Sequence, residues 1–513
     1  MTTEWIQPFE ARFEDYLRDE SKMSGQAASI SFPETKEAVV AIVRQMIGAS
    51  IPITVQGGKT GICGGAVPLS GHVLNLSCLN RILGLRKIGE GYFLKVQAGV
   101  RLDELKKQLY KRSFETHGWD EESLAALAAF KQDNAYFWPP EPTETSATIG
   151  GILATNAQGI CGYLYGDTRQ YVEELGLIDG RGNEITIPRG EYKLHAQQWI
   201  LPVEESPAAN SDILKLQQDG DWLDLYLGSE GMYGIIVDAT LRLIERPQEI
   251  WGVAFFSEGQ DNLFQFAEEL SRAAYKEGTA AIAAIEYIDK ATLDYIRKLK
   301  EVATNLQALP SVDEKYAGMI YIELHGEQEG DIETIAEKLM ELSGKCGCDE
   351  EFTWALSGVE EIEKMRAFRH AAPESINMAL EQARRSDPRI MKLSTDITMP
   401  NQSFGKVLTM YQHDARENGA EIAIFGHVAG NHVHVNFLPK NYEEYVVGKK
   451  LIEKWTIQAA REGGIVFSEH GVGKIKKELF KLVTDHEVLS HIHKVKKAMD
   501  PKNVLNPGNR FDE

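Results

Sequence analysis

The 513-residue sequence contains no uninterrupted stretch of about 18 apolar residues, the length that a membrane-spanning helix needs. Its first residues, MTTEWIQPFEARFEDYLRDE, are acidic and lack the basic start and apolar centre of a secretory signal peptide. We therefore expect a cytoplasmic protein without a transmembrane segment, and peripheral association with a membrane stays open as an alternative.

Basic residues are also scarce, since 55 Lys and Arg stand against 76 Asp and Glu and give a net charge of −21. Binding to nucleic acid requires clustered basic side chains, so the composition argues against that function. The cysteines are few, odd in number and without a disulfide-like framework, which indicates a reducing compartment. They are Cys63, Cys78, Cys161, Cys346 and Cys348, and the sequence offers no run of them for an iron–sulfur cluster.

The Cys346-Gly-Cys348 segment is the one cysteine pair that suggests metal or redox chemistry. It has no second cysteine pair and no nearby histidine, so we interpret it as two ordinary thiols.

The chain is long enough for about three domains. Thr35 precedes an apolar stripe that predicts a helix from residue 36, and strands are predicted at 52–54 and in the segments HVLNLS and YFLKVQAGV. This mixture predicts an α+β fold. We place domains at residues 1–247, 248–455 and 456–513, with Pro247 at the first boundary and a largely helical C-terminal segment that ends in a loop-rich tail.

Three glycine-rich segments lie in the first domain, at residues 55–68, 147–159 and 228–235. Glycine allows the backbone to approach a ligand closely, and consecutive N–H groups can bind a pyrophosphate. None of the segments fits the dinucleotide fingerprint GxGxxG or a P-loop. In a fixed order and each at a strand boundary, they suit a long, extended cofactor.

A cluster of histidines marks the second half of the chain. His427, His432 and His434 occur in GHVAGNHVHVN, and a Glu469-His470 pair follows in FSEHGVGK. Two imidazoles and one carboxylate are a familiar ligand set for a catalytic divalent metal, and a further histidine can act as general base near neutral pH.

The glycine-rich segments resemble the FAD-binding domain of the vanillyl-alcohol oxidase/p-cresol methylhydroxylase superfamily, in its glycolate oxidase and D-lactate dehydrogenase branch. There the segments read GGGTGxxGGAVP, PPxPxxxxTIGGxxATNAGG and GSEGTLGI, and YGDTRQYV at 165–172 matches a further family segment. The resemblance implies a PCMH-type FAD-binding domain, a separate α/β substrate (cap) domain and a C-terminal segment that returns to the flavin. It assigns pyrophosphate binding to Gly57, Gly58, Thr60 and Gly61, and flavin contacts to Gly150, Gly151, Thr155, Asn156, Glu230, Ile235 and, in the tail DPKNVLNPG, Asn506.

The second half resembles the C-terminal FAD-linked oxidase segment of the same branch, which reads GHxGDGNxHxN and later SGEHGIG. The resemblance implies that His427, His434 and Glu469 bind a divalent metal such as zinc or manganese. It implies His470 as catalytic base and assigns the substrate site to Asn436, Arg369 of MRAFRHAAPE and Lys392 of MKLSTDITMP. Arg369 can also be interpreted as a solvated charge on a helix. For Lys392 a structural role is favoured over substrate binding.

The sequence departs from the family in two places that matter. Lys59 replaces a glycine of the first loop, and no histidine stands there to bind the flavin covalently, so we expect FAD to be non-covalent. Ala429, Gly430, Asn431 and His432 replace the GDGN of the family, which loses an Asp and gains a histidine near the metal.

The resemblance implies oxidation of a small D-2-hydroxy acid of the D-lactate, glycolate or D-2-hydroxyglutarate class. His470 would take the hydroxyl proton while a hydride moves to flavin N5. An electron-transfer flavoprotein or a quinone would then accept the electrons, and we expect a homo-oligomer. Two alternatives stay open: a non-redox flavoenzyme similar to alkylglycerone-phosphate synthase, and a flavin-bearing electron-transfer subunit that has lost catalysis.

Overall fold

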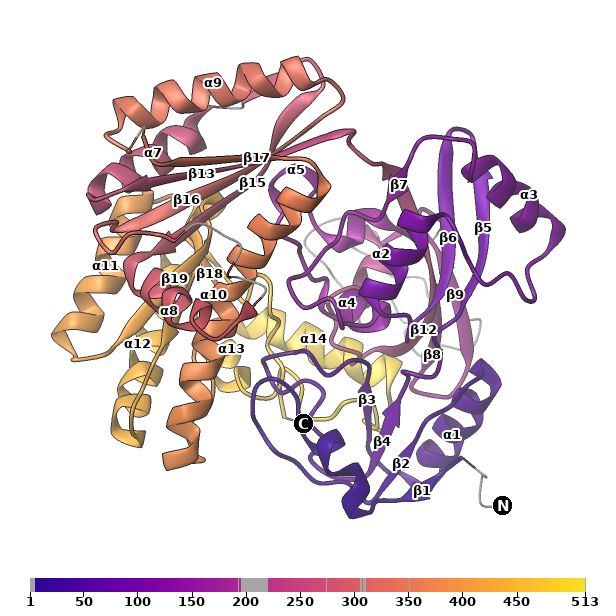
Figure 1. Ribbon diagram of the computed structural model, residues 1–513. Coiled ribbons are helices and arrows are strands. Elements are labelled where there is room, and N and C mark those ends of the chain that lie inside the picture. The colour runs from indigo at the N-terminus through magenta and orange to yellow at the C-terminus, as the bar shows by residue number, and fades with distance from the viewer. Residues whose placement is uncertain are drawn as a thin grey trace. The chain divides into compact units, whose positions relative to one another are not determined.

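The computed structural model describes residues 5–191, 193–194, 220–273, 275–304, 307, 311–349 and 351–512. The chain forms two compact units, and each is built from separate stretches of sequence. Unit 1 comprises residues 1–159, 167–246 and 469–513, and unit 2 comprises residues 160–166 and 247–468. The domain boundaries expected from the sequence lie at 247/248 and 455/456, whereas the units change at 246/247 and 468/469. The α+β class predicted from the sequence is confirmed, because both units combine helices with sheets (Figure 1).

Unit 1 contains two larger sheets. Its first sheet has the strand order β1-β2-β4-β3, in which β2, β4 and β3 run parallel and β1 pairs antiparallel with β2. These strands are β1 (Gln7–Pro8), β2 (Ser29–Ser31), β3 (Ile53–Gln56) and β4 (His72–Asn75). Helix α1 (Lys36–Ala49) begins where the sequence predicted, because the Thr35 side chain accepts a hydrogen bond from the Ala38 amide.

The second sheet of unit 1 has the order β5-β6-β12-β8-β9, and β7 pairs with an end of β12. All its pairs are antiparallel. The strands are β5 (Ile82–Ile88), β6 (Gly91–Gln97), β7 (Tyr136–Phe137), β8 (Val172–Asp179), β9 (Glu184–Pro188) and β12 (Gly234–Glu245). A short pair, β10 (Lys193–Leu194) and β11 (Gly220–Asp221), also belongs to this unit. The helices are α2 (Leu102–Lys111), α3 (Glu121–Phe130), α4 (Ile149–Thr155), α6 (Trp222–Tyr226), α13 (Lys477–Val483) and α14 (His486–Met499).

The C-terminal tail is part of the core of unit 1. Val504 and Leu505 are buried in the cluster that holds the apolar face of α1. Leu505 forms a parallel bridge with Ile53 of β3, and the Asn506 amide donates to the Ile53 carbonyl at 2.8 Å. The tail therefore extends the edge of the first sheet.

Unit 2 is built on one antiparallel sheet with the order β17-β13-β16-β15-β19-β20. Its strands are β13 (Glu249–Ser257), β15 (Ala280–Asp289), β16 (Gly318–Gly326), β17 (Thr353–Ser357), β19 (Ile422–His427) and β20 (His432–Phe437), with β14 (Lys276–Glu277) paired to β15. A separate two-stranded pair joins β18 (Ile397–Thr398) to β21 (Ile465–Val466).

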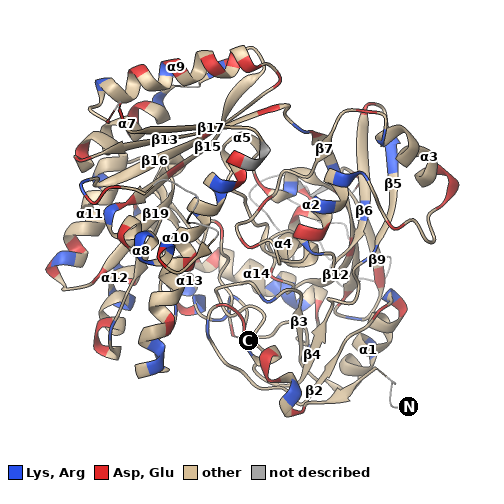
Figure 2. Ribbon diagram, in the orientation of Figure 1, with Lys and Arg blue, Asp and Glu red and all other residues tan. Residues whose placement is uncertain are grey.

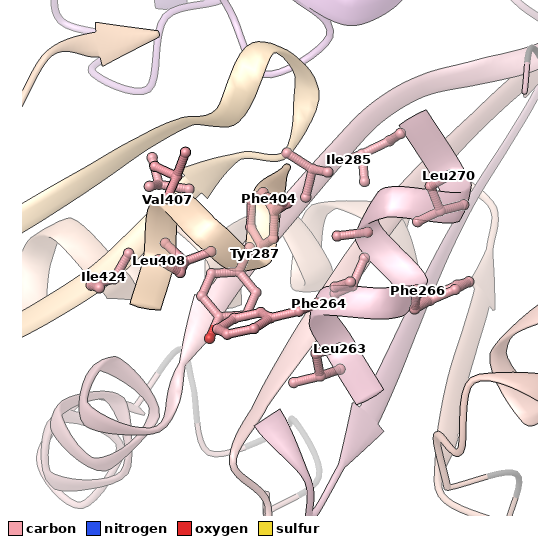
Figure 3. Close-up of a cluster of buried hydrophobic side chains, with 14 of the residues drawn as sticks. Leu263, Phe264, Phe266, Leu270, Ile285, Tyr287, Phe404, Val407, Leu408 and Ile424 are labelled. Atoms are coloured by element: carbon pink, nitrogen blue, oxygen red, sulfur yellow. The ribbon is translucent and has the colours of Figure 1, made fainter. Parts of the chain in front are cut away.

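Helices pack on both faces of this sheet. The first face packs against α7 (Gln260–Arg272), α9 (Glu329–Lys345), α11 (Phe404–Glu417) and α12 (Tyr442–Arg461). Figure 3 shows part of this core, where Phe404 meets both Phe264 and Tyr287 edge to face. The second face packs against α8 (Lys290–Lys300) and α10 (Val359–Ser386), and α5 (Gly162–Tyr165) contacts β15. Alternate residues of each strand thus enter different cores.

Figure 2 shows part of the acidic excess of the chain on α9, whose sequence EGDIETIAEKLMELSGK carries more acidic than basic residues. Within the described part of the chain, no helix combines the length and the apolarity needed to cross a membrane. None of the five cysteines forms a disulfide, and Cys346 and Cys348 are buried in the core of unit 2.

Candidate functional site

The first two glycine-rich segments pack directly against each other in unit 1. The first follows β3, and a Cβ atom on Gly57 would lie 2.1 Å from Oγ1 of Thr148, the residue that caps α4. A Cβ on Gly58 would lie 2.7 Å from the Ser146 carbonyl. By contrast, a Cβ on Gly61 would meet no protein atom within 4 Å, so protein packing does not explain that glycine. Thr60 lies beside it in the same loop.

The second glycine-rich segment forms α4 and carries four of the predicted flavin residues. Gly150 is required by packing, because its Cβ would lie 2.7 Å from the Ala98 side chain, whereas a Cβ on Gly151 would lie 3.4 Å from Thr148. Thr155 donates from its hydroxyl to the Gly151 carbonyl. Asn156 ends the helix with a φ of 49° and binds Asp167 and the Arg169 amide. Its side chain therefore links the end of α4 to the residues that follow the segment 157–166.

The third segment joins the second to the C-terminal tail. The amides of Gly228 and Glu230 donate to the carbonyls of Leu153 and Ala154, at 3.0 and 2.7 Å. Asn506 reaches the third segment from the tail: it donates to the Glu230 and Gly231 carbonyls and accepts from the Val55 amide. Ile235 is 1% exposed, and it lies in the core of the unit.

These contacts place all the residues predicted to bind FAD in one unit, on the three glycine-rich segments and the C-terminal tail. Lys59 fits this arrangement although it replaces a glycine, because it adopts the left-handed conformation with a φ of 58°. Its ammonium donates to the Asp15 carbonyl and lies 4.2 Å from the centre of the Tyr16 ring. The substitution thus ties the loop to the N-terminal segment.

Three histidines of unit 2, His427, His432 and His434, lie on one face of its sheet. His427 ends β19 and pairs directly with His432 at the start of β20, and His434 follows two residues later. Directly paired residues and alternate residues of a strand point to the same face. The ring centres are 5.0 to 6.3 Å apart, and His432 and His434 are 5% and 6% exposed.

His427 is held by a buried ion pair. Its Nδ1 atom contacts the carboxylate of Glu286, a residue of β15 that is 1% exposed. Nε and Nη2 of Arg369, from α10, lie 2.9 Å from the same carboxylate. Burial by itself raises the pKa of Glu286, but Arg369 and His427 lower it from the ordinary 4.5 to about 2. Glu286 is therefore ionised at neutral pH and accepts from Nδ1 of His427.

His434 and His432 have different partners. Nδ1 of His434 lies 3.2 Å from the Thr395 carbonyl, which can only accept, so Nδ1 carries the hydrogen. His432 instead uses Nε2, which lies 3.3 Å from Asp396 and 3.0 Å from the Ser468 hydroxyl. The hydrogen-bond pattern therefore separates His427 and His434 from His432.

The tautomers of His427 and His434 fit a metal site. Histidines that bind metals usually donate one ring N–H to a carboxylate or a backbone carbonyl, which orients the other nitrogen towards the ion. Glu286 and the Thr395 carbonyl provide these two kinds of acceptor, so in the neutral form of both rings Nε2 carries the lone pair. Imidazole nitrogen is a ligand that zinc and manganese accept, and the assignment of these two histidines as metal ligands stays a prediction.

Of the residues predicted to bind substrate, Asn436 lies on the same face of β20 as His434 and donates to its carbonyl at 3.0 Å. Arg369 contacts Glu286, as described. Lys392 donates to the side chain of Asn377 on α10 at 3.0 Å. Their roles in substrate binding stay predictions.

Glu469 and His470 begin the final segment of unit 1 and precede Val472 and Gly473, whose amides bind Glu230. Their assignments as third metal ligand and as base also stay predictions from the sequence.

Sequence reasoning missed Glu286, although a signal was present. It is the one charged residue between Ala280 and Ile288 in an otherwise apolar or aromatic strand. A buried carboxylate in such a strand requires a buried partner, which here comes from a helix 83 residues away.

A second buried polar cluster was also missed. His325 contacts the Tyr165 hydroxyl through Nδ1 and Glu323 through Nε2, both at 2.7 Å. Arg366 pairs with Glu323, and Cys161 lies 3.6 Å from the same carboxylate. Although Cys161, Glu323 and His325 together have the composition of a metal site, the Arg366 guanidinium already neutralises the carboxylate, so we interpret the cluster as a structural network.

Comparison with known families finds two family domains in the chain. Residues 27–118 and 122–187 match the FAD binding domain, and residues 261–509 match the C-terminal domain of FAD linked oxidases. The chain therefore belongs to the FAD-linked oxidases, and it is an FAD-linked oxidoreductase with a PCMH-type FAD-binding domain.

The chain is similar over nearly its whole length to several curated proteins. It is 25% identical to D-lactate dehydrogenase of Anaerostipes hadrus over 501 residues, which covers 96% of this chain and 92% of the relative. Glycolate oxidase subunit GlcD of Bacillus subtilis is 26% identical over 466 residues, covering 90% and 84%. D-2-hydroxyglutarate dehydrogenase of Xanthomonas citri pv. viticola is 26% identical over 513 residues, covering 98% and 93%.

Solved structures share the fold at lower identity. The 4-ethylphenol oxidase from Gulosibacter chungangensis has a TM-score of 0.68 at 16% identity and covers 100% of this chain and 95% of its own. p-Cresol methylhydroxylase has a TM-score of 0.67 at 14% identity, covering 99% and 94%. Alkyldihydroxyacetonephosphate synthase has a TM-score of 0.66 at 16% identity, covering 99% and 82%. At these identities the likeness supports the fold alone.

Proposed function

We propose that this FAD-linked oxidoreductase oxidises a small D-2-hydroxy acid to the 2-oxo acid and passes the electrons to a separate acceptor. Relatives named for D-lactate, glycolate and D-2-hydroxyglutarate support the substrate class. The observation that carries the proposal is the pair of imidazoles of His427 and His434, each held by an acceptor at Nδ1. A hydroxy acid offers a hydroxyl and a carboxylate oxygen, which are suitable partners for a metal held there.

The reaction removes a proton from the hydroxyl oxygen and a hydride from the α-carbon, which leaves a carbonyl. When bound, FAD supplies the hydride acceptor at N5, and a divalent metal would lower the pKa of the hydroxyl. In the proposal, His427 and His434 hold the metal together with Glu469, and His470 accepts the hydroxyl proton. Glu286 acts through His427 by fixing its tautomer.

The substrate carboxylate needs a cation, and the proposal assigns Arg369 to this role with Lys392 as a second anchor. Nε and Nη2 of Arg369 face Glu286, so the substrate would share this guanidinium with a buried carboxylate. A guanidinium has five N–H donors and can serve two carboxylates at once. Asn436, on the face of β20 that carries His434, would donate to a substrate oxygen.

Anaerobic reduction of the purified, FAD-loaded protein tests the proposal. D- and L-lactate, glycolate and D- and L-2-hydroxyglutarate are added in turn, and bleaching of the flavin is followed before and after chelation. We expect one D-acid or glycolate to bleach the flavin stoichiometrically and chelation to slow the reduction at least about tenfold. Elemental analysis should find a divalent metal in the wild type, and the metal content should be lower in His434→Asn.

The matched control is His413→Asn, which changes an exposed histidine of α11. It should keep both the metal and the rate. If none of the acids bleaches a flavin that dithionite still reduces, the proposal is wrong, and the non-redox enzyme and the electron-transfer subunit become the leading alternatives. If bleaching occurs but neither chelation nor His434→Asn alters it, the metal assignment is wrong and the flavin chemistry stands.

A further inference from the structure

The segment that carries Glu469 and His470 is held to unit 1 by contacts that the assignment of flavin residues does not explain. Gly471, Val472, Gly473 and Lys474 follow directly, and each has a defined backbone contact in this unit. The importance of this segment rests on the proposed function in one respect, that His470 is the base.

Glu230 makes the first of these contacts. Its carboxylate accepts from the Val472 amide at 2.8 Å and from the Gly473 amide at 2.7 Å, one oxygen to each. Arg510 donates to the same carboxylate from Nε at 3.1 Å. Glu230 is 7% exposed, and its partners lie more than 240 residues later in the chain. Its carboxylate is thus engaged by the C-terminal segment.

Cys63, from the first glycine-rich loop, also contacts the segment. Its thiol donates to the Gly471 carbonyl at 3.4 Å, and its own carbonyl accepts from the Lys474 and Ile475 amides at 3.0 and 3.2 Å. A Cβ on Gly473 would lie 2.1 Å from the Cys63 carbonyl oxygen. The segment is therefore in close backbone contact with the loop that is predicted to bind the pyrophosphate.

The glycines of the segment are required by this fit. Gly471 and Gly473 have φ values of 74° and 54°, which L-residues rarely adopt. A Cβ on Gly471 would lie 2.9 Å from Oε1 of Glu230. Glu230 itself has a φ of 55°, a conformation that persists only where surrounding contacts enforce it.

Glu230 is in turn fixed to the second glycine-rich segment. Its amide donates to the Ala154 carbonyl at 2.7 Å, and its carbonyl accepts from Asn506 and Asn509. One residue therefore connects the loop that carries the predicted flavin contacts with the amides two and three positions after His470.

We propose that Glu230 is a positioning residue that fixes the His470 segment to the FAD-binding loops, and that its carboxylate serves this segment instead of the flavin. A carboxylate can accept from two amides at once, one at each oxygen, whereas a carboxamide has one oxygen and an NH₂ group that would face the second amide. Glu230→Gln therefore keeps the size of the side chain and breaks the clamp. Misplacing a reacting group by about 1 Å can cost about 100-fold in rate.

The test compares FAD-loaded wild type, Glu230→Gln and Glu230→Asp. In Glu230→Gln we expect FAD content and the flavin spectrum to be unchanged and the substrate KM to change less than about threefold. The rate of anaerobic flavin reduction should fall about 10- to 100-fold. Glu230→Asp keeps both acceptor oxygens on a shorter stem and should recover part of the rate. Glu245→Gln, at the exposed end of β12, is the matched control and should behave as wild type.

Hydrogen exchange gives a direct readout of the clamp. The Val472 and Gly473 amides should exchange at least about tenfold faster in Glu230→Gln, with no change in α1. Gly473→Ala, which places a methyl group against Cys63, should reproduce the slow reduction and provides a second test if Glu230→Gln fails to fold. Unchanged exchange at these amides together with weaker FAD binding would overturn the inference and make Glu230 a flavin contact.

The two hypotheses fail in different ways. A wild-type flavin that no 2-hydroxy acid reduces contradicts the proposed function, and the exchange measurement still decides whether Glu230 holds the segment. A wild type that is reduced, together with a Glu230→Gln variant of equal rate, contradicts the inference alone.

Discussion

Replacing Glu286 by Gln tests the buried pair behind His427. The carboxylate is 1% exposed and contacts the Arg369 guanidinium through two nitrogens and His427 through Nδ1. Gln has the same shape and no charge, so the substitution removes the ionic part of these contacts and leaves Arg369 buried without its counter-ion. Truncating one partner of a buried ion pair typically costs about 3–5 kcal/mol.

The pKa of Glu286 gives an independent magnitude. Arg369 and His427 outweigh burial and lower it from 4.5 to about 2, and each pKa unit corresponds to about 1.36 kcal/mol. The charged form therefore contributes about 3 kcal/mol to the free energy of unfolding. Because the pKa is lowered in the folded state, this contribution is fully present above pH 4.5 and is lost as the pH falls through about 2. At pH 7.5 Glu286→Gln should show the whole loss.

Calorimetry of the FAD-loaded protein measures the effect, since it can separate the transitions of the two units. A loss of about 3 kcal/mol in a domain of this size should lower the Tm of the unit 2 transition by about 6–12 °C. Glu341→Gln is the control: Glu341 pairs with Lys345 on the surface of α9, and its loss should cost less than about 0.5 kcal/mol.

A double-mutant cycle with Arg369→Met decides the cause. The double variant should be more stable than the sum of the single changes predicts, because neither charge is then buried alone. A Glu286→Gln variant within about 1 kcal/mol of wild type, or strictly additive changes, would show that the pair does not stabilise unit 2 as we infer.

Two further predictions concern buried groups whose pKa values are displaced by burial. Burial raises the pKa of Asp289 from 3.8 to about 6, so its ionisation destabilises the fold as the pH rises through 6. Asp289→Asn keeps the cap on the Thr292 amide, and it should be more stable than wild type by up to about 3 kcal/mol at pH 7.5 and equally stable near pH 3.5. Equal stability of the two proteins at pH 7.5 would contradict this reasoning. Burial lowers the pKa of Lys474 from 10.5 to about 8, so unfolding takes up a proton between these pH values and the free energy of unfolding rises with pH. The stability of wild type relative to Lys474→Met should rise by about 2 kcal/mol between pH 8 and 9.5. A flat difference between the two proteins in thermal scans across this range would refute the reasoning.

Local features of the fold were predictable from the sequence. The α1 helix combines an apolar stripe with an N-cap at Thr35, and both signals act within a few residues. The strands predicted at 52–54 and in YFLKVQAGV are present as β3 and β6. The spacing of His432 and His434 is enough to imply a shared face on a strand, since the period of a strand is fixed at two.

Long-range partners were not predictable in the same way. That His427 pairs with His432 depends on the register of β19 and β20, which the intervening turn sets. The partners of Glu286 and Glu230 come from segments 83 and about 240 residues away, and no local pattern encodes such a distance. The sequence shows that Lys59 replaces a glycine of the family pattern, but only the structure shows that the lysine adopts a positive φ of 58°.

The division of unit 1 into three stretches has a consequence for biosynthesis. Ile53 obtains its neighbour Leu505, and Glu230 its amide partners, from residues 469–513, which leave the ribosome after all of unit 2. Domains generally fold as they are synthesised, from the N-terminus onwards. In this chain all of unit 2 is synthesised before unit 1 can close, so the edge of its first sheet stays incomplete until residues 469–513 have emerged.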